Sequence, residues 1–306
     1  MPGAVVARPI RVLYVPTTKA ACTTLKRLVS EAAGLYDEAG FDVLTRPHLT
    51  PDQAIHEQVV NGFEYFRNLW DEDQQGILES DEWWKVGAVR NPYARVYSAF
   101  ENNWLLFRGT VRDSFRPLYA EVADGECLNL TATFEHFVRM LREHPSVLMG
   151  DDHFRTQVQQ LHPREIGYTH FIHVDRPGEL EGFAREIRER SGRDVQLRRL
   201  NEGLGVKYRD VMTAESARMI EEIYAEDFAV LDYPTETFPE AIEPRILTPT
   251  ESRLVSLVQQ TWYRQWQISI VALGQSGFRY GLRQIGARAK GRALEMLGRA
   301  PLTPDH

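Results

Sequence analysis

Cysteine is scarce in this 306-residue chain, and long apolar runs are absent. The two cysteines, Cys22 and Cys127, are too few for a disulfide framework or a zinc cluster, so we expect two reduced thiols. No run of about eighteen apolar residues exists, which excludes a transmembrane helix. The first residues also lack the basic start and apolar core of a signal peptide. These absences predict a cytoplasmic protein.

The chain also lacks an excess of basic residues. The net charge is −7 and the pI is about 5.8, whereas a general nucleic-acid binder normally carries a positive charge. The composition is that of an ordinary globular protein, with 43% apolar and 26% charged residues. We therefore expect no nucleic-acid partner, and any anion-binding site must be local.

Lysine is much rarer than arginine, with five lysines against 31 arginines. Two of the five, Lys19 and Lys26, lie within eight residues of each other, after an apolar β-type run at residues 12–15. Pro16 ends this run, a loop of small and hydroxyl residues follows, and a helix is predicted from about residue 23 to 33. Because free backbone N–H groups and the helix dipole converge on such a loop, the segment predicts a site for a phosphate or sulfate group.

A second unit of strand, turn and helix follows further along the chain. Residues 83–89 read as a buried strand, and Arg90 stands at its end. Pro92 can begin the helix that we expect to continue to residue 104. Ligands of open α/β sheets bind at the carboxyl ends of strands, where Arg90 lies. Its planar guanidinium suits a terminal phosphate, and Ser98, two turns along the helix, can add one hydroxyl.

The rest of the pattern also alternates strands with helices. Helices are predicted at residues 128–143, 179–191 and 212–231, and a strand is predicted at residues 168–174. This alternation is typical of an α/β domain with a parallel sheet.

Four prolines between residues 234 and 249 interrupt the regular pattern. We therefore predict a domain of residues 1–238 and a C-terminal helical extension of residues 239–306. Its last helix, expected over residues 278–299, carries six basic residues against Glu295 alone. Such a helix can bind an anionic membrane peripherally or dock on an acidic partner. We favour a third interpretation, the surface helix of a cytosolic protein.

Three blocks of the sequence resemble carbohydrate sulfotransferases of the chondroitin 4-O and HNK-1 type. Residues 18–27, Thr-Lys-Ala-Ala-Cys-Thr-Thr-Leu-Lys-Arg, are similar to the loop that binds the 5′-phosphosulfate of 3′-phosphoadenosine 5′-phosphosulfate (PAPS) in that family. Residues 86–100, which include Arg-Asn-Pro-Tyr-Ala-Arg-Val-Tyr-Ser, resemble its 3′-phosphate segment, and Asp-His-Phe-Arg-Thr-Gln at 152–157 resembles a third block. The resemblance covers about residues 9–233. It implies the sulfotransferase fold, a P-loop-like central parallel sheet flanked by helices.

The resemblance also implies a reaction and a set of site residues. The family moves a sulfuryl group in line from PAPS to a hydroxyl without a metal, and a carbohydrate or glycosylated metabolite is the implied acceptor. Lys19 would neutralise the bridging oxygen as the S–O bond breaks. The other residues implied to hold the cofactor are Ala21, Cys22, Thr23, Thr24, Arg90, Ser98, Arg199 and Asn201.

The acceptor hydroxyl needs a general base, and histidine suits that task. His48 is the leading candidate, because related sulfotransferases place a base in the region after the first strand and helix; it can equally be a surface histidine in a loop. His153 is the rival, since it lies in the third block. His56 is expected to be solvated in a polar helix.

Two other functions fit the sequence less well. A nucleotide or sugar kinase of the P-loop type is disfavoured, because the chain lacks the Gly-x-x-x-x-Gly-Lys-Ser/Thr pattern and Lys19 precedes the helix. A non-catalytic nucleotide-binding module is disfavoured by the intact Lys19, Arg90 and Ser98. The acceptor pocket is expected in the loops of residues 41–83 and 103–129, which do not name the acceptor.

Overall fold

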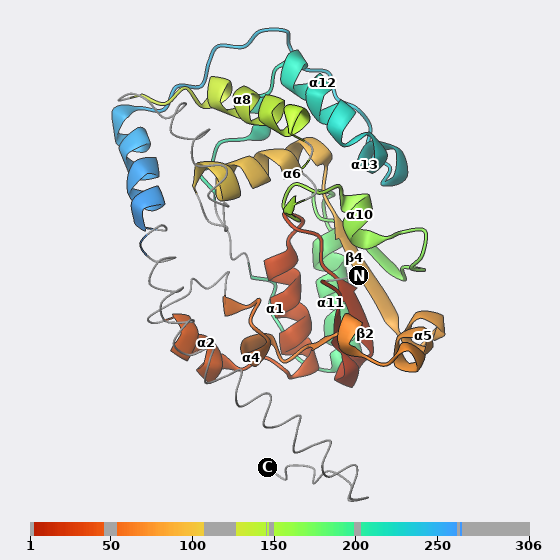
Figure 1. Ribbon diagram of the computed structural model, residues 1–306. Helices are drawn as coiled ribbons and strands as arrows, with labels where there is room; N and C mark the ends of the chain where they lie inside the picture. The colour runs from red at the N-terminus through yellow and green to blue at the C-terminus, as the bar shows by residue number, and fades with distance from the viewer. Residues whose placement is uncertain are drawn as a thin grey trace, which may run out of the picture.

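The computed structural model describes residues 3–45, 54–106, 127–144, 146, 150–198, 203–261 and 264, and Figure 1 shows their arrangement. The strands are β1 (Val5–Ala7), β2 (Val12–Val15), β3 (Glu64–Tyr65), β4 (Trp84–Val89) and β5 (His170–His173). The α-helices are α1 (Cys22–Ala33), α2 (Glu38–Thr45), α4 (Gln58–Asn61), α5 (Asp71–Glu79), α6 (Pro92–Ala99), α8 (Leu130–Glu143), α10 (Gln157–Leu161), α11 (Glu179–Ser191), α12 (Ala214–Ile223) and α13 (Ala225–Val230). Shorter 3-10 turns cover Arg8–Ile10, Phe66–Asn68 and Tyr208–Asp210, a π-helical segment covers Phe100–Leu105, and residues 249–261 are helical.

The five strands form one mixed sheet in the order β3-β1-β2-β4-β5. β2, β4 and β5 run parallel, with Val12 opposite Trp84 and Val86 opposite His170. β1 and β3 pair antiparallel on the other side of β2. The predicted parallel sheet is therefore confirmed for the three strands that long crossovers connect. The sequence did not predict the antiparallel edge, where a single 3-10 turn between β1 and β2 permits only antiparallel pairing.

Alternating side chains give β2 an apolar surface on both faces of the sheet. Val12 and Tyr14 pack in the core that the sheet forms with α1 and α11. Leu13 and Val15 pack in the core on the opposite side, which α5 and α10 cover. Since both faces are covered, polar ligands have access to this part of the sheet only at its edges and strand ends.

A further apolar core lies beyond the carboxyl ends of the strands, where α6, α8 and α12 stack (Figure 1). The Phe100 ring contacts Phe134 and Phe137, with centroids 5.1 and 5.4 Å apart. Leu247 and Val255, which follow the proline-containing segment, are buried in the same core. The chain therefore packs against this layer beyond residue 239, and the boundary at that point stays a prediction.

Most predicted helices have the expected bounds. α1 and α11 end at Gly34 and Gly192, whose φ angles of 69° and 65° suit glycine. The helix predicted at 212–231 is wrong in one respect, since it breaks at Tyr224 into α12 and α13. The buried hydroxyl of Tyr224 donates to the Phe154 carbonyl at 2.8 Å, which fixes the break.

The helix predicted at 93–104 has two parts, α6 and the π-helical segment Phe100–Leu105. The basic helix predicted at 278–299 lies outside the described residues. Within the ranges given above, no helix has the length and apolarity needed to cross a membrane.

Candidate active site

The carboxyl ends of the three parallel strands meet at one edge of the sheet. The loop of residues 16–21 follows β2, Arg90 follows β4, and Asp175 comes shortly after β5. Asp175 Oδ1 accepts the N–H of Asn91 at 3.3 Å, which joins the ends of β4 and β5. Lys19 and Arg90, which the sequence singled out, therefore lie where open α/β sheets bind their ligands.

The loop that follows β2 has a strained backbone. Lys19 and Ala21 have φ angles of 65° and 54°, in the left-handed region that residues other than glycine seldom adopt. No side chain caps α1, whose first N–H groups therefore remain suited to an anion. The buried hydroxyl of Thr17 has no hydrogen-bond partner among the described residues. The first turn of α1 contains Cys22, Thr23 and Thr24.

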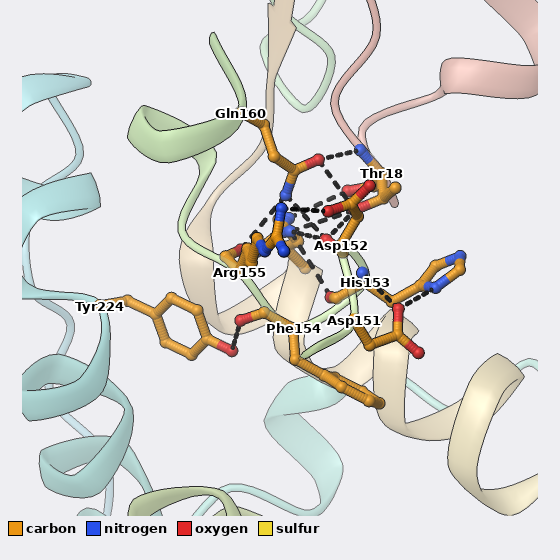
Figure 2. A network of polar contacts seen from close by, with 9 residues as sticks. Thr18, Asp151, Asp152, His153, Phe154, Arg155, Gln160 and Tyr224 are labelled. Atoms are coloured by element: carbon orange, nitrogen blue, oxygen red, sulfur yellow. Dashed lines mark hydrogen bonds and ion pairs between the residues drawn. The ribbon is translucent and has the colours of Figure 1, made fainter. Parts of the chain in front are cut away.

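A network of hydrogen bonds holds this loop against α10 and the residues before it (Figure 2). The N–H of Thr18 donates to Gln160 Oε1 at 3.0 Å, and its hydroxyl donates to the carbonyl of Asp152 at 2.7 Å. Gln160 Nε2 donates to the same carbonyl at 2.8 Å. Arg95 is only 1% exposed, and its Nε donates to the Thr18 carbonyl at 2.9 Å. The loop is thus joined to two other segments of the chain, α6 and residues 152–160. We call Thr18, Arg95, Asp152 and Gln160 the Thr18 network.

Arg90 is held through its backbone as well as its side chain. Its N–H donates to Gln157 Oε1 at 2.9 Å, and Gln157 Nε2 donates to its carbonyl at 2.8 Å. Gln157 is fully buried, and its own N–H donates to Asp227 Oδ2 at 2.9 Å. Nη1 of Arg90 donates to the carbonyl of Lys19 at 3.3 Å. The half-buried guanidinium therefore lies beside the loop that follows β2.

Lys26 and Arg27 turn to different sides of α1. Nζ of Lys26 lies 2.8 Å from Nδ1 of His56, whereas Arg27 Nε pairs with Glu31 at 2.8 Å. The prediction that His56 is a solvated helical residue was wrong. His56 lies in a turn before α4 and is half-buried against Lys26.

His56 lies among positive charges. Burial is the main reason why the pKa of His56 falls to about 3, and the charge of Lys26 is the second. The charges of His153 and Lys19 act on His56 in the same direction. These four side chains, from three separate segments, therefore share one region of the site.

His153 is oriented by a carboxylate. Its Nδ1 lies 2.7 Å from Asp151 Oδ1, and the same oxygen accepts the N–H of His153 at 2.9 Å. Because an ionised carboxylate only accepts hydrogen bonds, Nδ1 carries the proton and Nε2 of the neutral ring keeps its lone pair. The ring projects away from the Thr18 network and is 32% exposed (Figure 2).

The other predicted site residues lie elsewhere or are not described. Ser98 is half-buried near the end of α6, where the π-helical segment begins. One turn later, Glu101 Oε1 accepts the N–H of Leu204 at 2.7 Å, which ties the residues after position 202 to this helix. The predicted residues outside the described ranges are His48, Arg199 and Asn201. Across those ranges, no group of three His, Cys, Asp or Glu side chains is arranged to hold a metal ion.

Sequence reasoning missed several polar residues of this edge. Arg95 could have been found, because a charged residue between the apolar positions Tyr93 and Val96 has to be solvated or paired. No local sequence pattern pointed to Asp227, because its partner Gln157 lies 70 residues away. The pairing of Lys26 with His56 likewise depends on tertiary contacts.

The strand ends, the uncapped α1 and the cations around it give this α/β protein a sheet edge of the kind that suits an anion. The sequence profile of the sulfotransferase family matches residues 2–234. This match spans most of the chain, and the protein therefore belongs to the sulfotransferase family, which supports sulfotransfer as its general reaction. No curated protein and no solved structure gave a significant match.

Proposed function

We propose that this protein transfers the sulfuryl group of PAPS to an acceptor hydroxyl, with a carbohydrate or a glycosylated metabolite as the acceptor class. One contact carries the proposal: Nη1 of Arg90 donates to the carbonyl of Lys19 at 3.3 Å, in a chain of the sulfotransferase family. A loop suited to a phosphosulfate thus adjoins an arginine suited to a 3′-phosphate, which supports PAPS as the donor. Resemblance to carbohydrate sulfotransferases supports the acceptor class.

The residues of the loop after β2 fit an anionic cofactor. Left-handed backbone at Lys19 and Ala21, followed directly by the uncapped N-terminus of α1, is the kind of backbone that forms anion-binding nests. The buried Thr17 hydroxyl offers one further donor. PAPS, when bound, supplies the activated sulfuryl group and leaves as adenosine 3′,5′-bisphosphate.

Fixed positive charge is the main catalytic contribution that we assign to the chain. Lys19 balances the negative charge that develops on the bridging oxygen as the S–O bond breaks. Arg90 and Ser98 hold the 3′-phosphate, and the N–H and hydroxyl groups of the first turn of α1 hold the phosphosulfate. The Thr18 network keeps the loop in place, so donor and acceptor can align without reorganisation.

Of the two described histidines in this region, His153 and His56, the tautomers favour His153 as the base. Asp151 holds the proton on Nδ1 of His153, so Nε2 can accept the acceptor's proton. In His56 the Nδ1 atom accepts from the Lys26 ammonium, so the proton of the neutral ring is on Nε2, which then donates and cannot accept. His48, outside the described residues, is the alternative base.

Adenosine 3′,5′-bisphosphate is expected to raise the melting temperature of the protein, and ATP with magnesium is not. A ligand at 100 times its Kd stabilises the native state by about 2.7 kcal/mol. For a chain of 306 residues each kcal/mol raises the melting temperature by roughly 1.5–2 °C. Adenosine 5′-monophosphate, which lacks the 3′-phosphate, is the matched control and should give a smaller rise. Stabilisation by ATP with magnesium alone would support a kinase and overturn the proposal.

His153→Gln is expected to lower kcat by about 10²–10⁴-fold, the range typical for loss of a general base. Asp151→Asn is expected to cause a smaller loss, because an amide can offer Nδ1 either an oxygen or an N–H and no longer fixes the tautomer. The assay uses radiolabelled PAPS with a panel of disaccharides. His162→Gln is the control and should leave kcat unchanged, because His162 follows the last residue of α10 and pairs with Glu165 at 3.6 Å. Full activity of His153→Gln together with loss in His48→Gln would move the role of base to His48.

A further inference from the structure

The contact between Lys26 and His56 has no part in the reaction proposed above. The two residues are 30 positions apart, and Nζ of Lys26 lies 2.8 Å from Nδ1 of His56. Lys26 is on the second turn of α1, next to the turn that begins at Cys22. A lysine ammonium has donors and no acceptor, so its hydrogen bond occupies the only lone pair of the neutral ring. While Lys26 holds this contact, His56 cannot bind a second proton.

The groups around this contact are mostly cationic. Lys26 faces His56 from α1, Lys19 acts on it from the loop after β2, and His153 acts on it from the segment before α10. Cys22 and, less strongly, Glu57, the residue after His56, favour the charged form of Lys26. Burial lowers the pKa of both Lys26 and His56. An anion bound in this region would therefore favour the charged forms of both side chains.

We propose that Lys26 and His56 form a charge-responsive pair that couples binding of the anionic cofactor to the uptake of one proton. When the phosphosulfate binds at the start of α1, Lys26 transfers its hydrogen bond from Nδ1 of His56 to the anion. At a pH below the midpoint that His56 has in the complex, the freed Nδ1 takes a proton from the buffer and His56 becomes an imidazolium. This inference rests on the proposed function, since it takes the start of α1 as the site of the phosphosulfate.

The proposal gives His56 a role distinct from that of a base. A neutral ring with its proton on Nε2 becomes a cation only when the cofactor is present, so positive charge appears beside the transferred group when it is needed. Permanent charge on His56 would instead add to the repulsion between Lys19 and Lys26. Proton uptake also determines how the affinity for the cofactor changes with pH. Cofactor affinity is highest below the midpoint of His56 in the free protein, falls as the pH rises to the midpoint in the complex, and is constant above it.

The test follows the ring proton of His56 by NMR in the full chain with ¹³C-labelled histidine. Spectra are recorded from pH 5 to pH 8, with and without saturating adenosine 3′,5′-bisphosphate, and His56→Gln assigns the resonance. Without the nucleotide we expect no titration in this range, since the pKa of His56 is about 3. With the nucleotide we expect the midpoint to rise by about 2–3 pH units, as an opposite charge at short range can cause. The His162 signal is the control and should titrate alike in both samples.

Lys26→Met separates the pair from a general effect of the anion. This variant keeps the length of the side chain but has no ammonium to transfer. We expect His56 to titrate at a higher pH in the free variant, and we expect the nucleotide to move its midpoint by less than in the parent protein. Calorimetry of the parent protein at about pH 5, below the midpoint expected in the complex, measures the same proton uptake in two buffers of different ionisation enthalpy and does not depend on either variant.

The possible failures are distinguishable. Absence of nucleotide binding in the calorimeter would overturn the proposed function itself. Tight binding with an unchanged midpoint of His56, or a midpoint near 6.5 in the free protein, would overturn the charge-responsive pair and leave sulfotransfer intact. A midpoint that moves equally in the parent protein and in Lys26→Met would also overturn it, since the lysine would then have no part.

Discussion

Lys19→Ala is expected to lower kcat for sulfate transfer by about 10²–10³-fold, the loss typical when one group that stabilises transition-state charge is removed. Charge develops on the bridging oxygen only as the bond breaks, so kcat should fall more than the affinity for the cofactor. The fold should survive, because alanine already occupies a left-handed position two residues later at Ala21. Radiolabelled PAPS at saturating concentration gives kcat, and thermal denaturation checks the fold.

Lys207→Ala is the matched control for this result. Lys207 is exposed at the start of the Tyr208–Asp210 turn, and its loss should leave kcat within about twofold of the parent value. If Lys19→Ala transfers sulfate at the parental rate, Lys19 has no place in the mechanism. Lys26 would then be the remaining lysine at the start of α1 that could neutralise the leaving group.

Arg95→Met is expected to destabilise the protein by roughly 3–5 kcal/mol, the range for removing one partner of a buried charged contact. The carbonyls of Thr18 and Asp152 would each lose a donor. The buried carboxylate of Asp227 would also lose a nearby positive charge, which would raise its pKa further. Urea denaturation at neutral pH measures the loss as a lower midpoint with an unchanged slope.

Arg218→Met is the control for the loss of an arginine as such. The Arg218 side chain is 58% exposed and pairs with Glu240 at 3.3 Å, so its removal should cost less than about 1 kcal/mol. A stable Arg95→Met variant that fails to bind adenosine 3′,5′-bisphosphate would mean that Arg95 contacts the ligand. A stable variant with normal binding would show that the Thr18 network does not depend on Arg95.

Local signals in the sequence were enough for most of the fold. The β2, loop and α1 unit, the β4 and α6 unit, and the helix ends at Gly34 and Gly192 all follow from hydrophobic period and from caps. β1 and β3 could not be predicted, because strands of three and two residues have no measurable alternation. The break at Tyr224 depends on a contact with a residue 70 positions away, and no local pattern reports it.

The candidate site, like the fold, was predictable only in part. That Lys19 and Arg90 would lie near each other was predictable, since both follow parallel strands and such strands end at one edge of the sheet. The partners that hold them were not, because Gln160 and Gln157 are selected by packing of α10. His56 was misjudged for the same reason: a polar sequence around it suggested solvent, and its contact with Lys26 requires the turn before α4 to lie against α1.

The Thr18 network also determines when the site can form during synthesis. Thr18 is made early, Arg95 follows 77 residues later, and Gln160 follows 142 residues later. At a translation rate of about 5–20 residues per second, roughly 7–30 s pass between the synthesis of Thr18 and that of Gln160. A nascent chain shorter than about 160 residues therefore has β2 and α1 but no fixed loop between them. The cofactor site is thus a late product of folding, although the segment that gives it its lysine leaves the ribosome first.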